Sequence, residues 1–271
     1  MDLCAFEVSY TYPDGTKAID EVSLCIYSGE IACLLGPNGS GKSTLLLLLA
    51  GLIRPTSGYI TFKGVKLEYI ADYRRLCGVL FQDPSDQLIA PTVEEDVALG
   101  PKQLKLSDED VRVRVKSSLE RFGLLGFERR SPFRLSGGET ARVALAGLIA
   151  SDPQVYLLDE PSSSLDVRGI NVLKGLLREL KKKGKLVIIA TQDSDFASEV
   201  ADKIYIMSRG KLIAGGGLEV MKQLNFEEIG IKMPSALRIY KKLSIPLNDP
   251  PVNLDSLVEA LRRLLSTPER D

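Results

Sequence analysis

The sequence predicts an α/β fold, and two observations indicate it. Residues 31–35 and 155–158 are short, almost wholly apolar runs, which is typical of strands that are buried on both faces of a sheet. The first run leads through a glycine-rich turn at 36–41 into the apolar segment 43–52, which is the order of a strand, a tight turn and a helix.

The remaining elements follow from the same patterns. β structure is expected over residues 3–35, and a mostly helical region from about residue 83 to 152. Further strands are expected at 57–62, 78–81 and 186–190, a helix at about 166–183, and a closing hairpin at 204–207 and 211–214.

The C-terminal residues 225–271 differ in character, because they contain Pro234, Pro246, Pro250 and Pro251 with helical stretches between them. The last stretch has one apolar stripe at the helical spacing i, i+3, i+4, i+7. The stripe consists of Leu254, Leu257, Val258, Leu261, Leu264 and Leu265. Two interpretations remain open: a helix that closes the domain's own core, and a helix that binds a partner.

The length and composition of the chain exclude several classes of function. The chain has 271 residues, which allows one or two domains, and a chain of this length can bury a core without a disulfide or a structural metal. The 35 basic and 36 acidic residues leave a net charge of −1, so there is no overall attraction to nucleic acid and we expect no nucleic-acid partner. The chain contains no histidine, which excludes Ser-His-Asp hydrolases, histidine-ligated metals and phosphohistidine chemistry.

Membrane insertion and disulfides are not expected. The longest apolar run, residues 45–53, is far shorter than the roughly 20 residues that span a bilayer. The N-terminus has neither a basic region nor a long apolar segment, so we expect no signal peptide. The four cysteines (Cys4, Cys25, Cys33 and Cys77) are scattered and form no CxxC pair, which predicts thiols in a reducing compartment.

A phosphate-binding loop is the most specific motif. Gly36, Pro37, Asn38, Gly39, Ser40, Gly41, Lys42 and Ser43 match the pattern GxxxxGK[ST]. The glycines let backbone N–H groups turn inward on an anion, and the helix expected from Ser43 adds its positive N-terminal end. Lys42 is then expected to reach the β- and γ-phosphates of a nucleotide, and the Ser43 hydroxyl to ligate Mg²⁺. A glycine-rich turn with a chance lysine is the alternative, and the strand before and the helix after argue against it.

Two adjacent acids end the strand at 155–158. Asp159 is expected to hold Mg²⁺ through water, and Glu160 to act as the general base on the attacking water. A capping or salt-bridged pair would be the simpler interpretation if the phosphate-binding loop were absent. Ser136, Gly137 and Gly138 precede a helix and form a second turn that can bind an anion, although an ordinary helix cap explains them too.

The order of phosphate loop, Leu-Ser-Gly-Gly and acidic strand resembles the ATPase subunit of an ATP-binding cassette (ABC) transporter over roughly residues 3–224. The resemblance implies a P-loop ATPase with a RecA-like core, an antiparallel β subdomain and a helical subdomain at about 83–152, all within an ABC ATPase domain of residues 1–224. It also implies a small helical, dimer-stabilising extension at 225–271. ATP and Mg²⁺ are the implied cofactors, with ATP held by Gly36 through Thr44.

Other family landmarks can be located. Gln82 resembles the glutamine that contacts Mg²⁺ and the attacking water, and Tyr12 resembles the aromatic residue that stacks on adenine, with Tyr10 as the alternative. Residues 164–166 resemble the loop that crosses the dimer interface. In the family two subunits dock head to tail, so the resemblance implies that each ATP lies between the phosphate loop of one chain and the Ser136-Gly137-Gly138 turn of the other.

One landmark departs from the family. Gln192 stands in Thr-Gln-Asp, where the family has a switch histidine in a Thr-His-Asp sequence. Glutamine can donate a hydrogen bond to the γ-phosphate, but it carries no positive charge. Two interpretations remain open: a tolerated replacement at a working site, and a weakened site in an asymmetric pair.

Residues 81–101 indicate which branch of the family the chain resembles. The segment FQDPSDQLIAPTVEEDVALGP resembles the ATPases of energy-coupling factor (ECF) transporters and related cobalt or nickel importers, which bring vitamins or metal ions into prokaryotic cells. This resemblance implies a peripheral position on the cytoplasmic face of the membrane, and a transmembrane scaffold subunit docked near 82–101. It also implies a second, paralogous ATPase chain and an indirect link to a substrate-binding membrane subunit. The alternatives are a homodimeric ATPase of another ABC transporter, a soluble ABC ATPase that acts on ribosomes or DNA, and a nucleotide-dependent binding module that does not hydrolyse ATP.

Overall fold

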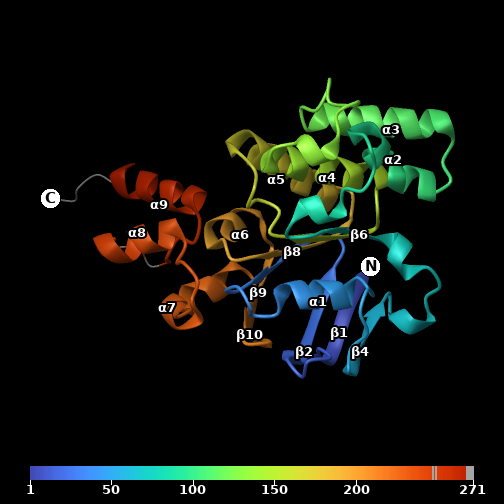
Figure 1. Cartoon of the computed structure of the whole chain (residues 1–271). Coiled ribbons are helices and arrows are strands. Elements are labelled where there is room, and N and C mark those ends of the chain that lie inside the picture. The colour runs from blue at the N-terminus through green and yellow to red at the C-terminus, as the bar shows by residue number, and fades with distance from the viewer. Residues whose placement is uncertain (246, 248, 267–271) are drawn as a thin grey trace.

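Two β-sheets and the helices packed on them make up the structure, a computed structural model that describes residues 1–245, 247 and 249–266 (Figure 1). The strands are β1 (Asp2–Thr11), β2 (Lys17–Tyr27), β3 (Ile31–Leu35), β4 (Ser57–Phe62), β5 (Val65–Lys66), β6 (Cys77–Leu80), β7 (Val155–Asp159), β8 (Leu186–Thr191), β9 (Lys203–Ser208) and β10 (Lys211–Gly216). The α-helices are α1 (Lys42–Leu49), α2 (Val93–Gln103), α3 (Asp108–Arg121), α4 (Gly137–Ser151), α5 (Val167–Lys182), α6 (Ser194–Val200), α7 (Phe226–Ile229), α8 (Ser235–Leu243) and α9 (Leu254–Ser266).

The central sheet has the strand order β10-β9-β3-β8-β7-β6, and its neighbouring strands are parallel except for the β9–β10 hairpin. Every residue of β3, β7 and β8 is buried, as the apolar runs predicted. Alternate residues of β3 face opposite cores: Cys33 packs on one side of the sheet and Leu34 on the other. Because parallel strands end at the same edge, the loops after β3, β6, β7 and β8 are gathered there.

The two faces of the central sheet are covered differently. Helix α1 and the antiparallel sheet β2-β1-β4-β5 share a core on one face. Helices α2, α3, α4 and α5 lie on the opposite side, and α2 to α4 fall inside the region where the sequence predicted helices (Figure 1). An ion pair of 2.6 Å between the Arg121 guanidinium and the Glu179 carboxylate joins α3 to α5.

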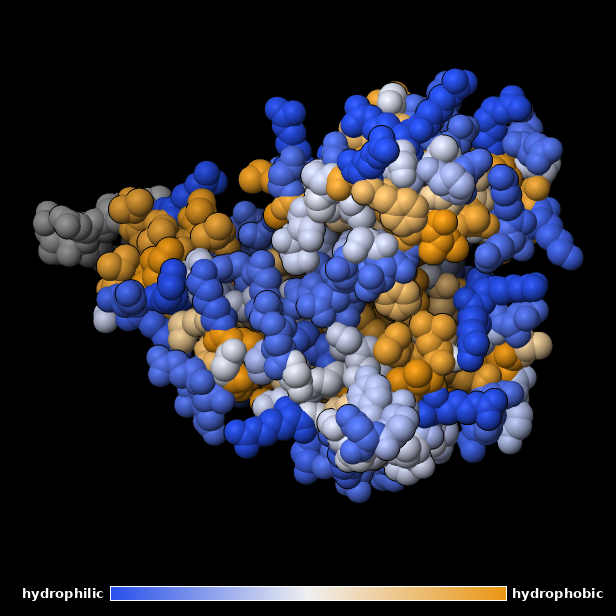
Figure 2. Space-filling view, viewed as in Figure 1, coloured by the Kyte–Doolittle hydropathy of each residue, from blue (hydrophilic) through white to orange (hydrophobic). Residues whose placement is uncertain are grey.

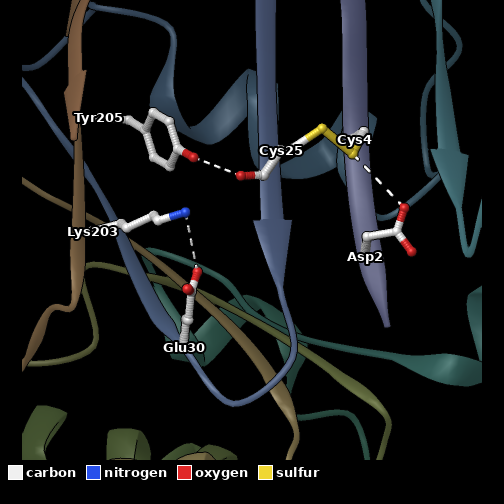
Figure 3. The surroundings of a disulfide bond; sticks show 6 residues. All are labelled: Asp2, Cys4, Cys25, Glu30, Lys203 and Tyr205. Atoms are coloured by element: carbon white, nitrogen blue, oxygen red, sulfur yellow. Dashed lines mark hydrogen bonds and ion pairs between the residues drawn. A yellow bond between two sulfur atoms is a disulfide. The ribbon is translucent and has the colours of Figure 1, made fainter. Parts of the chain in front are cut away.

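The antiparallel sheet corrects the prediction about cysteines. Its register places Cys4 of β1 directly opposite Cys25 of β2, and the two form a disulfide with a Cα–Cα distance of 4.2 Å (Figure 3). The prediction of free thiols is therefore wrong for this pair, while Cys33 and Cys77 are free. Spacing along the chain could not reveal the pairing, because β-bulges shift the register between the two strands.

The C-terminal residues contribute partly to the main core. Phe226 and Leu237 are buried in the core of the central sheet, so packing continues across residue 224, and the division placed there remains a prediction. In the α9 stripe Leu257 is buried, whereas Leu254, Val258, Leu264 and Leu265 are exposed. Core packing therefore explains only part of the stripe. Among the described residues, no helix has the length and the apolar character that crossing a bilayer requires.

Candidate functional site

A cleft of about 700 Å³ opens at the edge where the parallel strands end. Segments that are distant in sequence line it: Tyr12 after β1, the phosphate loop after β3, Gln82 after β6, and the acids Asp159 and Glu160 at the end of β7. The sheet topology thus gathers into one site the residues that the sequence motifs singled out separately.

The phosphate loop has the backbone that an anion site requires. Gly39 and Gly41 have φ values of 76° and 101°, a region that side chains disfavour. A Cβ atom on Gly36 would lie 2.3 Å from the Met207 carbonyl oxygen, so only glycine fits there. Helix α1 begins at Lys42, one residue before the expected Ser43, and has no side-chain cap and no acid in its first turn. Its N-terminal amides are therefore free to face an anion.

Lys42 places a positive charge at the floor of the cleft. Its side chain is buried, and its ammonium group donates to the carbonyl oxygens of Gly36 at 2.8 Å and Pro37 at 2.9 Å. Burial lowers the pKa of Lys42, and the nearby carboxylates of Glu160 and Asp159 oppose that shift. The Lys42 ammonium group therefore stabilises its own loop and places a positive charge where a phosphate would bind.

The two acids are buried, and burial raises the pKa of both Asp159 and Glu160. Thr191 donates its hydroxyl proton to Glu160 Oε2 at 2.9 Å, and the backbone N–H of Gln192 donates to Oε1 at 2.8 Å. Glu160 also has a left-handed backbone, with φ of 46°, which is a strained conformation of the kind found at functional sites. The Glu160 carboxylate is thus held in one orientation.

Two buried polar atoms beside the cleft have no partner within the described structure: Asp159 Oδ1 and Ser40 Oγ. An unpartnered buried oxygen is costly unless a ligand or water satisfies it. Asp159 lies near the Ser43 hydroxyl, whose hydrogen bond partly offsets the raised pKa of the carboxyl group. Both oxygens are therefore suited to accept a contact from a bound ligand or water.

Tyr12, and not Tyr10, lines the cleft. The Tyr12 hydroxyl lies 3.0 Å from Thr44 Oγ1, and Tyr10 packs edge-on against the Tyr12 ring with centroids 4.9 Å apart. The sequence did not identify Thr16, Lys17 and Arg209, which also line the cleft. No motif marked them, because β2 and the β9–β10 turn reach the cleft only through the folded sheet.

Two predicted groups lie apart from these residues. The Gln192 side chain is exposed and lines a neighbouring hollow with residues of the loop 230–232, so only its backbone touches the acid pair. Ser136, Gly137 and Gly138 lie at the start of α4 and are not among the described residues that line the cleft. A Cβ atom on Gly138 would lie 3.1 Å from the Ser164 carbonyl oxygen, so glycine allows close packing between these two segments.

Known proteins share both the sequence and the fold. Residues 19–163 match the ABC transporter family. The energy-coupling factor transporter ATP-binding protein EcfA of Methanococcus maripaludis is 44% identical over 214 residues, which cover 78% of this chain and 77% of that protein. The solved structure of cbiO1 from Clostridium perfringens, part of the ABC transporter complex cbiONQ, has a TM-score of 0.71 and 34% identity, and the match covers 90% of this chain and 98% of that one.

A second solved structure shows a dimer with products. The ATP-binding cassette MJ0796, in a dimeric post-hydrolysis state bound to ADP and Pi, has a TM-score of 0.71 and 31% identity, with 79% of this chain and 98% of that chain covered. The phosphate loop, the buried lysine and the paired acids described above lie within residues 19–163, which match the ABC transporter family. The chain therefore belongs to the ABC transporter family: it is an ATP-binding ATPase that resembles the ATP-binding subunits of energy-coupling factor transporters.

Proposed function

We propose that this chain is the ATP-hydrolysing subunit of an ECF-type importer of vitamins or metal ions, and that it works head to tail with a second ATPase chain. The main support is that the residues expected to bind one ATP do not all lie in one cleft of the chain. One chain brings together the phosphate loop and the acids, whereas its own Ser136, Gly137 and Gly138 lie outside that cleft. A second chain is needed to supply the equivalent turn to the bound ATP.

Mg²⁺ is proposed to bind together with ATP. The unpartnered Asp159 Oδ1 and the nearby Ser43 hydroxyl are oxygen ligands of the kind Mg²⁺ prefers, with Gln82 at the same cleft. The described part of the chain has no group of three or more histidine, cysteine, aspartate or glutamate side chains that could hold a metal ion. Phosphate and water would supply the other ligands of Mg²⁺, as is usual for this ion. When bound, Mg²⁺ supplies charge that offsets the phosphates.

The protein side chains then act around the nucleotide. Tyr12 is proposed to stack on the adenine ring and Lys42 to provide a fixed charge for the phosphates, and their position in the lining of the cleft supports both roles. Glu160 is proposed to accept the proton of the attacking water. Its raised pKa makes it a stronger base than an exposed glutamate, and Thr191 and Gln192 keep the carboxylate in position. Positioning and charge do most of the chemistry in such a reaction.

The segment 82–101 is proposed to dock the transmembrane scaffold subunit. The buried Asp96 carboxylate accepts hydrogen bonds from the backbone N–H groups of Ile89 at 2.7 Å and Ala90 at 2.8 Å, which fixes this loop. The same loop leaves the side chain of Ile89 72% exposed, beside a hollow of about 270 Å³ lined by Leu88 and Leu99. A rigid loop with an exposed apolar residue supports a docking role, and with it a peripheral position on the cytoplasmic face of the membrane.

The α8–α9 surface is proposed to contact the second ATPase chain. Apolar side chains gather over these helices in Figure 2, and the exposed ones are Ile239, Leu243, Leu254, Val258, Leu264 and Leu265. A single domain rarely leaves such a group uncovered. Val258→Asp should therefore weaken pairing, whereas Val113→Asp, at an exposed position on α3, serves as the matched control.

The test of the whole proposal is purification of the tagged chain from its native membrane. We expect a different ATPase chain and membrane subunits to co-purify, and we expect single-turnover ATP hydrolysis to be much faster in that complex than in the chain alone. Ile89→Asp should release the membrane subunits while the ATP affinity is kept. Recovery of a fast homodimeric ATPase without membrane subunits would instead support a soluble ABC ATPase.

A further inference from the structure

We propose that Asp195 and Ser235 form a positioning contact for ATP hydrolysis, through which the loop 230–235 of the C-terminal residues holds the segment that carries Gln192. The inference rests on the proposed function and extends it. The C-terminal residues are then part of the hydrolytic machinery as well as a surface for pairing. Hydrogen bonds, together with the backbone of residues 191–195, connect the general base to the start of α8.

The first bonds join the base to the switch segment. Thr191 is fully buried, and its hydroxyl donates to Glu160 Oε2 while accepting the backbone N–H of Asp193 at 3.0 Å. Gln192 lies between them, and its backbone N–H is held by the same Glu160 carboxylate. The orientation of the base and the path of the backbone at residues 191–193 are therefore set together.

Helix α6 continues directly from this segment. The Asp193 side chain caps the helix by accepting the backbone N–H of Phe196 at 3.0 Å. Ser194, at the first position of the helix, is 2% exposed, so it has no freedom to shift without disturbing its neighbours. A displacement of the first turn of α6 must consequently move Gln192.

The C-terminal residues hold that first turn. Ser194 donates its hydroxyl proton to the Lys232 carbonyl oxygen at 2.5 Å. The Asp195 carboxylate accepts both the backbone N–H of Ser235 at 2.5 Å and its hydroxyl at 2.8 Å. Because the residue before α8 is Pro234, which gives no side-chain cap, Asp195 caps α8 from another helix and places a negative charge at its positive end.

The same loop also reaches the phosphate loop. Gly230 lies so close to it that an added Cβ atom would be 3.9 Å from the Cβ of Pro37. Residues 230–232 and Gln192 line a shared hollow of about 370 Å³ next to the cleft. The loop 230–235 thus lies near the phosphate loop and is bonded to the first turn of α6, and the Asp195–Ser235 contact fixes its position there. A positioning role follows, because none of these C-terminal side chains lines the ATP cleft itself.

The experiment compares Asp195→Asn with a matched control in the complex purified from native membrane. Asp249→Asn makes the same chemical change within the C-terminal residues, where Asp249 pairs with Lys222 and not with α6. We expect Asp195→Asn to lower kcat about tenfold and to leave the ATP dissociation constant unchanged, since loss of a charge-assisted contact in a coupled network has effects of this order. Asp249→Asn should change neither quantity.

Two substitutions at Ser235 should change kcat to different extents. Ser235→Ala removes one of the two bonds to Asp195 and should lower kcat less than Asp195→Asn, whereas Ser235→Thr keeps the hydroxyl and should retain wild-type turnover. Amide hydrogen exchange in the full chain should speed up at residues 191–196 in Asp195→Asn and not in Asp249→Asn. This measurement needs neither a partner nor turnover.

Several outcomes would overturn the inference. Equal kcat values for Asp195→Asn and Asp249→Asn would do so, and so would a fall in kcat matched by an equal loss of ATP binding, because the contact would then be merely structural. If Asp195→Asn does not fold, an unchanged kcat in Ser235→Ala decides against the proposal. Failure of the wild-type complex to hydrolyse ATP would instead contradict the proposed function.

Discussion

The turn before α1 and the turn before α4 both carry glycine, and both begin a helix, yet their amides are used differently. At α1 the cap is Gly41, with no side-chain hydrogen bond and no acid in the first turn. At α4 the backbone N–H and the hydroxyl of Ser136 both donate to Glu139 Oε2, at 2.7 Å and 2.8 Å. The first helix start has no such internal acceptor, whereas at the second a carboxylate of the same chain takes the N–H and the hydroxyl of Ser136.

This difference explains why one chain holds only part of an ATP site. The phosphate loop is ready for an anion as soon as the chain folds, because the start of α1 has no side-chain cap and no acid in its first turn. The turn at Ser136 is satisfied internally by a capping box, and its interaction with Ser136 lowers the pKa of Glu139, which keeps that carboxyl group charged. In the proposed pair, the partner's nucleotide would therefore compete with Glu139 for the Ser136 hydroxyl when the two chains dock.

The largest effect on ATP hydrolysis is expected from substitution of Glu160, which lines the same cleft as the phosphate loop. Glu160→Gln should lower hydrolysis by about 10²- to 10⁴-fold, because the amide cannot accept the proton of water. ATP binding should persist: the amide oxygen can keep the hydrogen bond from Gln192, and the amide NH₂ can donate to the Thr191 hydroxyl. Single-turnover hydrolysis and sedimentation with ATP are the measurements, and an ATP-bound pair should accumulate. Turnover near the wild-type rate would show that Glu160 is not the base.

A somewhat smaller loss is expected for Lys42→Ala. Removing the ammonium group takes away a charge on the phosphates and the two bonds that brace the loop at Gly36 and Pro37. Turnover should fall about 10²- to 10³-fold, the usual result of deleting one electrostatic contact in a transition state. Lys17→Ala is the control, since Lys17 also lines the cleft but is exposed and pairs with Asp20. If both variants lost the same activity, the special role of Lys42 would be wrong.

Gln192→His tests whether the site of this chain is weakened. A charged imidazole donates a stronger hydrogen bond than an amide, so turnover at the site that uses this chain's Glu160 should rise about fivefold. The measurement is single-turnover hydrolysis in the mixed complex, with the general base of the partner disabled. An unchanged rate, together with fast hydrolysis by the chain alone, would favour the tolerated-replacement interpretation and contradict the asymmetric pair.

The smallest effect is expected from substitution of Glu139, at the turn before α4. Glu139→Gln keeps the capping box, which accepts either residue, and removes a negative charge from the surface that meets the partner's ATP. ATP-dependent pairing should tighten about twofold to fivefold at low salt and lose that gain at high salt. Glu95→Gln is the matched control, because Glu95 accepts a hydrogen bond from Thr92 at the start of α2 in the same way. Sedimentation in a Glu160→Gln background measures the strength of ATP-dependent pairing for each variant. If Glu139→Gln and Glu95→Gln changed pairing equally, competition by Glu139 would be contradicted.

Much of the fold followed from local patterns. The buried strands β3, β7 and β8 lie where apolar runs indicated them, because strands covered on both faces have few polar residues. Boundaries moved by a residue or so, as at β6, which was expected at 78–81 and runs from Cys77 to Leu80. The position of Arg209 at the cleft was not predictable, because the β9–β10 turn approaches the phosphate loop only after the sheet has formed, with Gly210 N–H bonded to the Ser40 carbonyl at 3.0 Å.

The sequence by itself determined the chemistry: a loop for phosphates, a lysine within it and two acids at the end of a strand, each encoded by neighbouring residues. Only the tertiary structure decided which distant segments meet. It paired Cys4 with Cys25, placed Gln192 in one hollow with residues 230–232, and brought Asp195 to the start of α8. The reason is physical, since strand register and helix packing depend on contacts between segments far apart in the chain, and neither composition nor periodicity records which of those contacts form.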